Sequence, residues 1–237
     1  MRALVIAKRE LASYFFSPIA YVAMFIFLIV CGIVFWGDFV PGQPAALRHL
    51  FESMVWMLAF AIPILSMGLL SQEWSSGTIE TLMTAPVDES DVIVGKFLGS
   101  FGFFVFLLMP TILYVLMLRM YAELDYGPIF SGYLGILFVG ALFISIGLFC
   151  SSLTRSQVIA AVLAMAVLAV VTILPWVLSS FASIPEWARK VLDQTVFQRY
   201  ADFSKGVIDF GNLVFFIATT MVFLFLTTKV LESRRWK

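Results

Sequence analysis

The chain has 237 residues, of which 62% are hydrophobic and only 13% are charged, and its formal net charge is zero. Its mean hydropathy of +1.01 lies far above that of soluble proteins, so a soluble globular domain is excluded. The balanced charge gives no reason to expect a nucleic-acid partner.

Six apolar segments are long enough, or nearly so, to cross a hydrocarbon layer of roughly 30 Å as helices. Lipid offers no partner to open backbone groups, and the segments lack the alternation of barrel strands. The expected fold class is therefore all-α integral membrane, with one domain over residues 1–237. The expected spans are residues 18–36, 53–70, 97–118, 129–150, 158–181 and 210–231.

Before the first span, apolar residues recur at helical spacing on the side opposite the polar ones: Leu4, Ala7, Leu11 and Phe15. This pattern predicts an amphipathic helix on the inner membrane surface that bends into the first span near Pro18. A simple cytoplasmic extension of that span is the alternative. The apolar run is too long for the hydrophobic region of a cleaved signal, so we interpret it as a retained anchor.

A polar, helix-patterned segment, residues 73–87, separates the second and third spans. Its apolar residues Ile79, Leu82 and Met83 follow helical spacing, and Pro86 ends the pattern. The segment is expected to form a short amphipathic helix parallel to the membrane surface. Asp88 can cap a new helix that begins at about Glu89, so a push on the short helix would pass along the third span into the bilayer.

Small and kinking residues mark several spans. Gly95, Gly99 and Gly102 permit close approach of another helix, either from this chain or from a second one. Pro63, Pro110 and Pro175 each remove a backbone donor inside a span and are expected to kink or interrupt it. Cys31 and Cys150 lie in spans, where packing is their usual role.

Orientation follows from the basic residues. An even number of spans places both termini on one side, together with nine of the fifteen Lys and Arg residues. The positive-inside rule then predicts that both termini are cytoplasmic.

Several function classes are disfavoured. No charged residue lies at the centre of any span, which argues against an ion-coupled carrier or pump. No HExxH or Gly-x-Ser-x-Gly element supports an intramembrane protease. Around Gly95-Lys96, Ser90 and Phe97 stand where a phosphate-binding loop needs Gly and Ser or Thr, so we expect the chain to be no enzyme by itself and to need a partner to hydrolyse ATP.

The pattern Glu73-x-x-x-Gly77-Thr78-x-Glu80-x-Leu82, followed by Ala85-Pro86-Val87, resembles the signature of ABC-2 type permeases, the membrane subunits of ATP-binding-cassette exporters. Residues 17–21, 152–157 and 231–236 agree, so the resemblance covers essentially the whole chain. Residues 203–209 add a likeness to the gliding-motility-associated permeases of this family.

The resemblance implies a division of labour in a bacterial cytoplasmic (inner) membrane. Two permease chains, identical or different, would form the path, and two cytoplasmic ATPase subunits would bind ATP and Mg and drive it. The permease itself would bind no cofactor. The alternative is a membrane anchor or mechanical scaffold that couples the ATPase to an extracytoplasmic accessory protein without moving a solute.

The resemblance also assigns roles to residues. A coupling helix over about residues 75–86 would dock on the ATPase, with Glu73 and Glu80 as polar anchors and Gly77 as the break in the chain. The remaining residues of this expected site are Thr78, Ile79, Leu82, Met83 and Pro86, with Arg155 in a second contact over residues 152–157. Short re-entrant helices between spans five and six would close the path externally through Pro185, Trp187 and Val191; a helix resting on the outer surface is the alternative.

Overall fold

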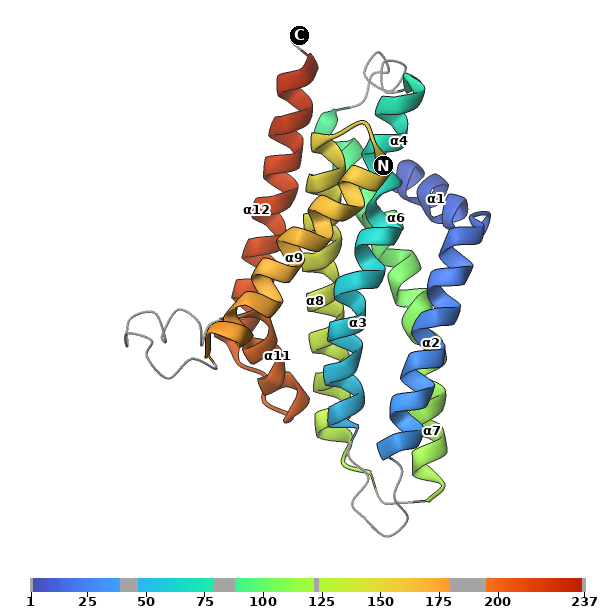
Figure 1. Ribbon diagram of the computed structural model, residues 1–237, viewed down its shortest axis with the longest axis vertical. Coiled ribbons are helices and arrows are strands. Elements are labelled where there is room, and N and C mark those ends of the chain that lie inside the picture. Colours follow the sequence, from blue (N-terminus) through green and yellow to red (C-terminus); the bar gives the residue numbers. More distant parts are fainter. Residues whose placement is uncertain (1, 39–46, 79–87, 122–123, 180–194, 236–237) are drawn as a thin grey trace.

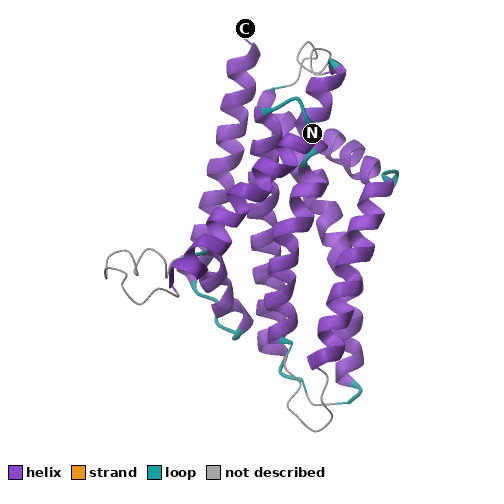
Figure 2. Cartoon of the chain, viewed as in Figure 1, coloured by secondary structure: helices purple, strands orange, loops and turns teal. Residues whose placement is uncertain are grey.

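The structure is a computed structural model that describes residues 2–38, 47–78, 88–121, 124–179 and 195–235, and within these ranges every regular element is a helix (Figures 1 and 2). The side chains at residues 173–176, 178–179 and 234–235 are outside this description. The expected all-α fold class is confirmed for the described part of the chain.

Five helical segments in the described ranges are long and apolar enough to cross a membrane. They are α2 (Pro18–Asp38), α3 with α4 (Arg48–Ser66 and Gly68–Ser76), α6 with η1 and α7 (Glu89–Leu108, Met109–Thr111 and Ile112–Arg119), α8 (Tyr126–Leu153) and α12 (Phe210–Arg235). Helix α9 (Gln157–Ser179) occupies the expected fifth span, and its continuous stretch with described side chains, Gln157–Thr172, is apolar but is not counted among these five segments. The count of six spans therefore stays a prediction.

Helix α8 forms the centre of the bundle and contacts α3, α6, α9 and α12. Small residues make this possible, because a Cβ atom on Gly132 would lie 2.6 Å from the Phe51 ring of α3. A Cβ on Gly140 would overlap the ring of Phe104 from α6 in the same way. Aromatic rings from neighbouring helices thus fill the space that the glycines leave open.

Two of the expected proline effects can be compared with the structure. Pro63 lies inside the continuous helix α3, and the break comes four residues later at Met67, between α3 and α4. Pro110 lies in the 3-10 turn η1 that divides α6 from α7, as expected for a residue without a backbone donor.

Helix α1 (Arg2–Phe15) packs along α6, and the chain turns at Phe16 and Ser17 before α2 begins at Pro18. The expected apolar stripe accounts for this contact only in part, because Leu4 is 66% exposed while Tyr14 is buried. Helix α6 begins at Glu89, as predicted, but the Asp88 side chain makes no capping hydrogen bond. The expected cap is wrong in that detail.

The helices alternate in direction along the long axis of the bundle (Figure 1). Helix α1, the end of α4 and the end of α12 lie toward one end of the molecule, whereas the end of α2 and the start of α8 lie toward the other. The short helix α11 (Val196–Ser204) packs on α8 and α3, away from the end that carries α1 and α4. Residues 79–86, which are most of the expected coupling helix, and the expected external gate residues lie outside the described residues.

Candidate functional site

A buried cluster of charges joins three helices at the end of the bundle where α1 and α4 lie. Lys96 of α6 is only 1% exposed, and its Nζ atom lies 2.9 Å from Glu73 Oε1 of α4 and 3.3 Å from Glu10 Oε2 of α1. Arg9 of α1 lies 3.5 Å from the same Glu73 oxygen. We refer to Arg9, Glu10, Glu73 and Lys96 as the Lys96 cluster.

The cluster balances two positive and two negative charges where water is largely excluded. The side chains of Lys96, Glu10 and Glu73 are 2%, 14% and 16% exposed, whereas Arg9 is 62% exposed and reaches the surface. A buried ammonium group is tolerated only when carboxylates compensate its lost hydration. Glu73 Oε2 is enclosed and has no hydrogen-bond partner among the described residues, so it can still accept a donor.

Glycines bring α1 close enough to α6 for these contacts. A Cβ atom on Gly95 would lie 2.7 Å from Ile6 Cβ, and one on Gly99 would lie 2.7 Å from Glu10 Cβ. Real side chains do not approach so closely, so both positions require glycine while α1 stays in place. The sequence allowed the glycine-lined face of α6 to contact a helix of this chain or of a second chain. In the structure it contacts α1 of the same chain.

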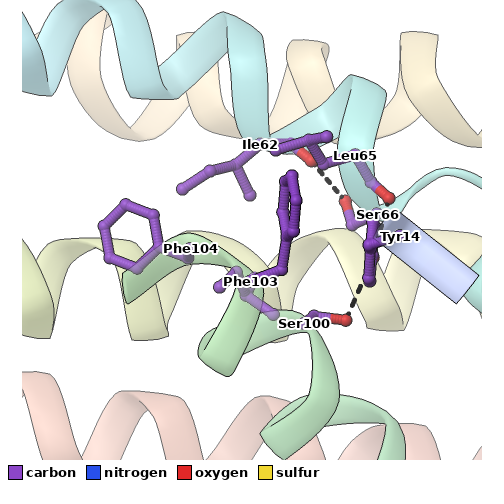
Figure 3. A pocket seen from close by; sticks show the side chains of 8 residues that line it. Tyr14, Ile62, Leu65, Ser66, Ser100, Phe103 and Phe104 are labelled. Carbon is purple, nitrogen blue, oxygen red and sulfur yellow. Dashed lines mark hydrogen bonds between the residues drawn. The ribbon is translucent and has the colours of Figure 1, made fainter. Parts of the chain in front are cut away.

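Hydrogen bonds next to the cluster fix α1 against α3 as well. The Tyr14 hydroxyl donates to the Leu65 carbonyl oxygen at 2.9 Å and lies 3.1 Å from Ser100 Oγ of α6 (Figure 3). Burial raises the pKa of Tyr14 above the ordinary value of 10.0. Tyr14, Ser100 and Phe103 line a small cavity between α1, α3 and α6 (Figure 3).

The first turn of α4 is held by α8. Ser151 Oγ accepts hydrogen bonds from the backbone amides of Leu70 and Ser71, both at 3.0 Å, and donates to the Met67 carbonyl oxygen at 2.8 Å. One buried hydroxyl thus satisfies backbone groups that the break between α3 and α4 leaves open. Ser151 comes directly before the expected second ATPase contact, residues 152–157.

The expected coupling residues are distributed around this end. Helix α4 ends at Ser76, and Gly77 follows with a φ of 72°, a left-handed conformation that favours glycine. Thr78 and Arg155 are exposed. The expected residues Ile79, Glu80, Leu82, Met83 and Pro86 lie outside the described residues.

Glu73 differs from the exposed Thr78 and Arg155, because its carboxylate points to Lys96 and Arg9. Lys96, Glu10 and Tyr14 were not among the expected site residues. Lys96 directly precedes the expected third span and was counted with the loop charges. Lys96 lies seven residues after the helix start at Glu89 and between Gly95 and Gly99. This position on the glycine-lined face is the signal that could have predicted its burial.

A groove of about 250 Å³ lies beside the cluster, between the turn from α1 to α2 and the break from α3 to α4. Its polar lining includes Glu10, Ser17, Gln72 and Gln157, and its apolar lining includes Leu69. Glu10 is therefore reachable from outside the bundle through this groove.

On the opposite side of the molecule, α11 covers the start of α8. Tyr200 and Phe203 of α11 are fully buried, and Ser131 of α8 donates a hydrogen bond to the Phe203 carbonyl oxygen at 2.7 Å. Arg199 donates to Asn212 Oδ1 at 2.9 Å and so ties α11 to α12. The expected gate residues Pro185, Trp187 and Val191 lie outside the described residues.

Residues 4–236 match the family model described as ABC-2 family transporter protein. Among curated proteins, none matches the sequence. The family description does not distinguish a gliding-motility subgroup. Because the match extends over nearly the entire chain, the protein belongs to the ABC-2 family of transporter proteins.

Proposed function

We propose that this chain is the permease subunit of an ABC transporter, which couples ATP hydrolysis by a separate cytoplasmic ATPase subunit to export of a substrate. The match of residues 4–236 to the ABC-2 family carries this proposal. ATP and Mg would bind to the partner and not to this chain. The chain would cross the bacterial cytoplasmic (inner) membrane six times, with both termini in the cytoplasm, and pair with a second permease chain, identical or different.

The arrangement at the end of α4 supports a coupling role for the segment that follows it. Helix α4 leads through Gly77 into residues 79–87, where Ile79, Glu80 and Leu82 would contact the ATPase. Glu73 lies one helical turn before Gly77 and is bonded to Lys96 of α6. A displacement of the segment would therefore act on the start of α6. External closure would involve Pro185, Trp187 and Val191, next to the buried helix α11.

Co-purification tests this function. The chain is expected to purify from membranes with an ATP-binding-cassette ATPase, and Glu80→Arg or Leu82→Arg is expected to abolish that association. Ser233→Arg introduces the same side chain at an exposed position near the end of α12 and is the matched control. An ATPase that stays bound in the Glu80→Arg and Leu82→Arg variants would contradict the docking role, and a wild-type chain that binds none would contradict the function.

The alternative function is a membrane anchor or mechanical scaffold that couples the ATPase to an extracytoplasmic accessory protein, which the sequence likeness of residues 203–209 to gliding-motility permeases suggests. Reconstituted vesicles that contain the permease and the ATPase separate the two functions. ATP-dependent movement of a lipid or solute across the vesicle membrane supports export. ATP turnover without any such movement supports the scaffold.

A further inference from the structure

The three helices that meet at the Lys96 cluster share one property: each begins or ends at a break in the helical chain, although α4 and α6 also pack on α8. Helix α1 ends at the turn of Phe16 and Ser17, α4 begins after the break at Met67, and α6 ends at η1. Between these breaks, the glycine contacts join α1 to α6, and the ion pairs of the Lys96 cluster join both helices to α4.

We propose that α1, α4 and α6 move as one rigid unit when the transporter changes state, and that Lys96 is the positioning residue that holds the unit together. The unit's part in a transport cycle rests on the proposed function. The rigidity of the unit does not depend on that function, because all the contacts that form the unit lie within this chain.

The chemistry of the cluster suits this role better than apolar packing would. An ammonium group between two carboxylates has a fixed optimum, because separation of Lys96 from Glu10 or Glu73 leaves a buried charge without its partner. The cluster therefore sets the register of α1 and α4 along α6, which is the best-attested use of buried polar groups.

The connections of α4 also define where the unit would turn. The first turn of α4 is bonded to Ser151 of α8, while Glu73, further along α4, is bonded to Lys96 of α6. The start of α4 thus stays with the central helix, and its far end moves with α6. A push delivered beyond Gly77 would pivot α4 about Ser151 and carry α6 and α1 with it.

Distances between spin labels test the rigid unit. One pair, Ala12→Cys with Val94→Cys, lies within the unit, and a second, Val94→Cys with Val158→Cys, joins it to α9; all three positions are exposed. The native cysteines are buried. In the wild-type complex, trapping with ATP is expected to shift the second distance and leave the first unchanged. A first distance that changes on trapping would overturn the proposal.

Substitution of Lys96 is a second test of the rigid unit. Lys96→Met keeps the length of the side chain and removes the charge, so the first distance is expected to broaden even without ATPase or nucleotide. Lys229→Met is the matched control, since Lys229 pairs with Glu232 on the exposed side of α12. An unchanged first distance in Lys96→Met would overturn the proposal. Because this measurement needs no ATPase, it tests the rigid unit even if the chain binds no ATPase and the proposed function is wrong.

A neutral triple variant separates positioning from folding. Lys96→Met alone leaves two buried carboxylates without their partner and is expected to lower the thermal midpoint. Lys96→Met with Glu10→Gln and Glu73→Gln removes every buried charge of the cluster, and its midpoint is expected to equal that of the wild type. The ATP-dependent shift of the second distance is expected to be absent in both variants, because α6 is no longer held to α4. A triple variant that recovers the shift would show that the charges are dispensable and would refute the positioning role.

Discussion

The contact between α1 and α6 makes a quantitative prediction for Gly99→Ala. The added Cβ atom would lie 2.7 Å from Glu10 Cβ and 2.8 Å from the Ala7 carbonyl oxygen. Ordinary contacts between such atoms are about 3.5–4.0 Å, so α1 must move away by about 1 Å. Overpacking of this kind costs about 1–3 kcal/mol, and the same movement lengthens the 3.3 Å contact between Lys96 and Glu10.

Gly102→Ala is the matched control, because its Cβ atom would meet Leu11 Cδ1 at an ordinary 3.5 Å. Both substitutions replace glycine in the same helix, so the gain in helix propensity cancels in their comparison. For a chain of this size, about 1–3 kcal/mol corresponds to a thermal midpoint lower by about 2–12 °C for Gly99→Ala. The two variants are compared in the same detergent at the same scan rate, and amide exchange locates the change. Equal midpoints, or a lower midpoint without faster exchange in α1, would refute the close contact.

Two further predictions concern buried groups. Tyr14→Phe is expected to lower the free energy of unfolding by about 1 kcal/mol at neutral pH, because the Leu65 carbonyl oxygen loses a donor. Burial raises the pKa of Tyr14, so its contribution to the free energy of unfolding is complete below pH 10.0 and is lost as the pH rises toward the higher pKa of the folded state. Thermal midpoints of the wild type and Tyr14→Phe across this pH range test the prediction. A difference in midpoint that does not change with pH would contradict it. Cys31 and Cys150 are each 1% exposed and are expected to react with maleimide only after unfolding, so rapid labelling of either in the folded protein would contradict its burial.

The positions of the long helices were predictable because lipid imposes a large penalty on every charged residue and every open backbone group. That penalty acts locally and can be summed along the sequence. The start of α6 at Glu89 was likewise predictable, since the residues around a helix start are local signals. The packing of α1 was not, because Gly95 and Gly99 show that a helix can approach but not which one.

The Lys96 cluster was missed for a related reason. Lys96 stands one residue before the expected third span, where a basic residue ordinarily faces the cytoplasm. Its two acceptors lie at positions 10 and 73 on different helices, and no local spacing connects them. Glu73 was associated with the ATPase through a family motif, and a motif gives the type of residue without the direction of its side chain.

The separation of Glu10 from Lys96, 86 residues along the chain, also determines when their contact can form during synthesis. At roughly 5–20 residues per second, α1 leaves the ribosome roughly 4–17 s before the lysine that neutralises its glutamate. During that interval the glycine face of α6 does not yet exist, and α1 has only the solvent or the lipid surface to cover it. The packing of α1 into the bundle can therefore be completed only after the third long apolar segment has been synthesised.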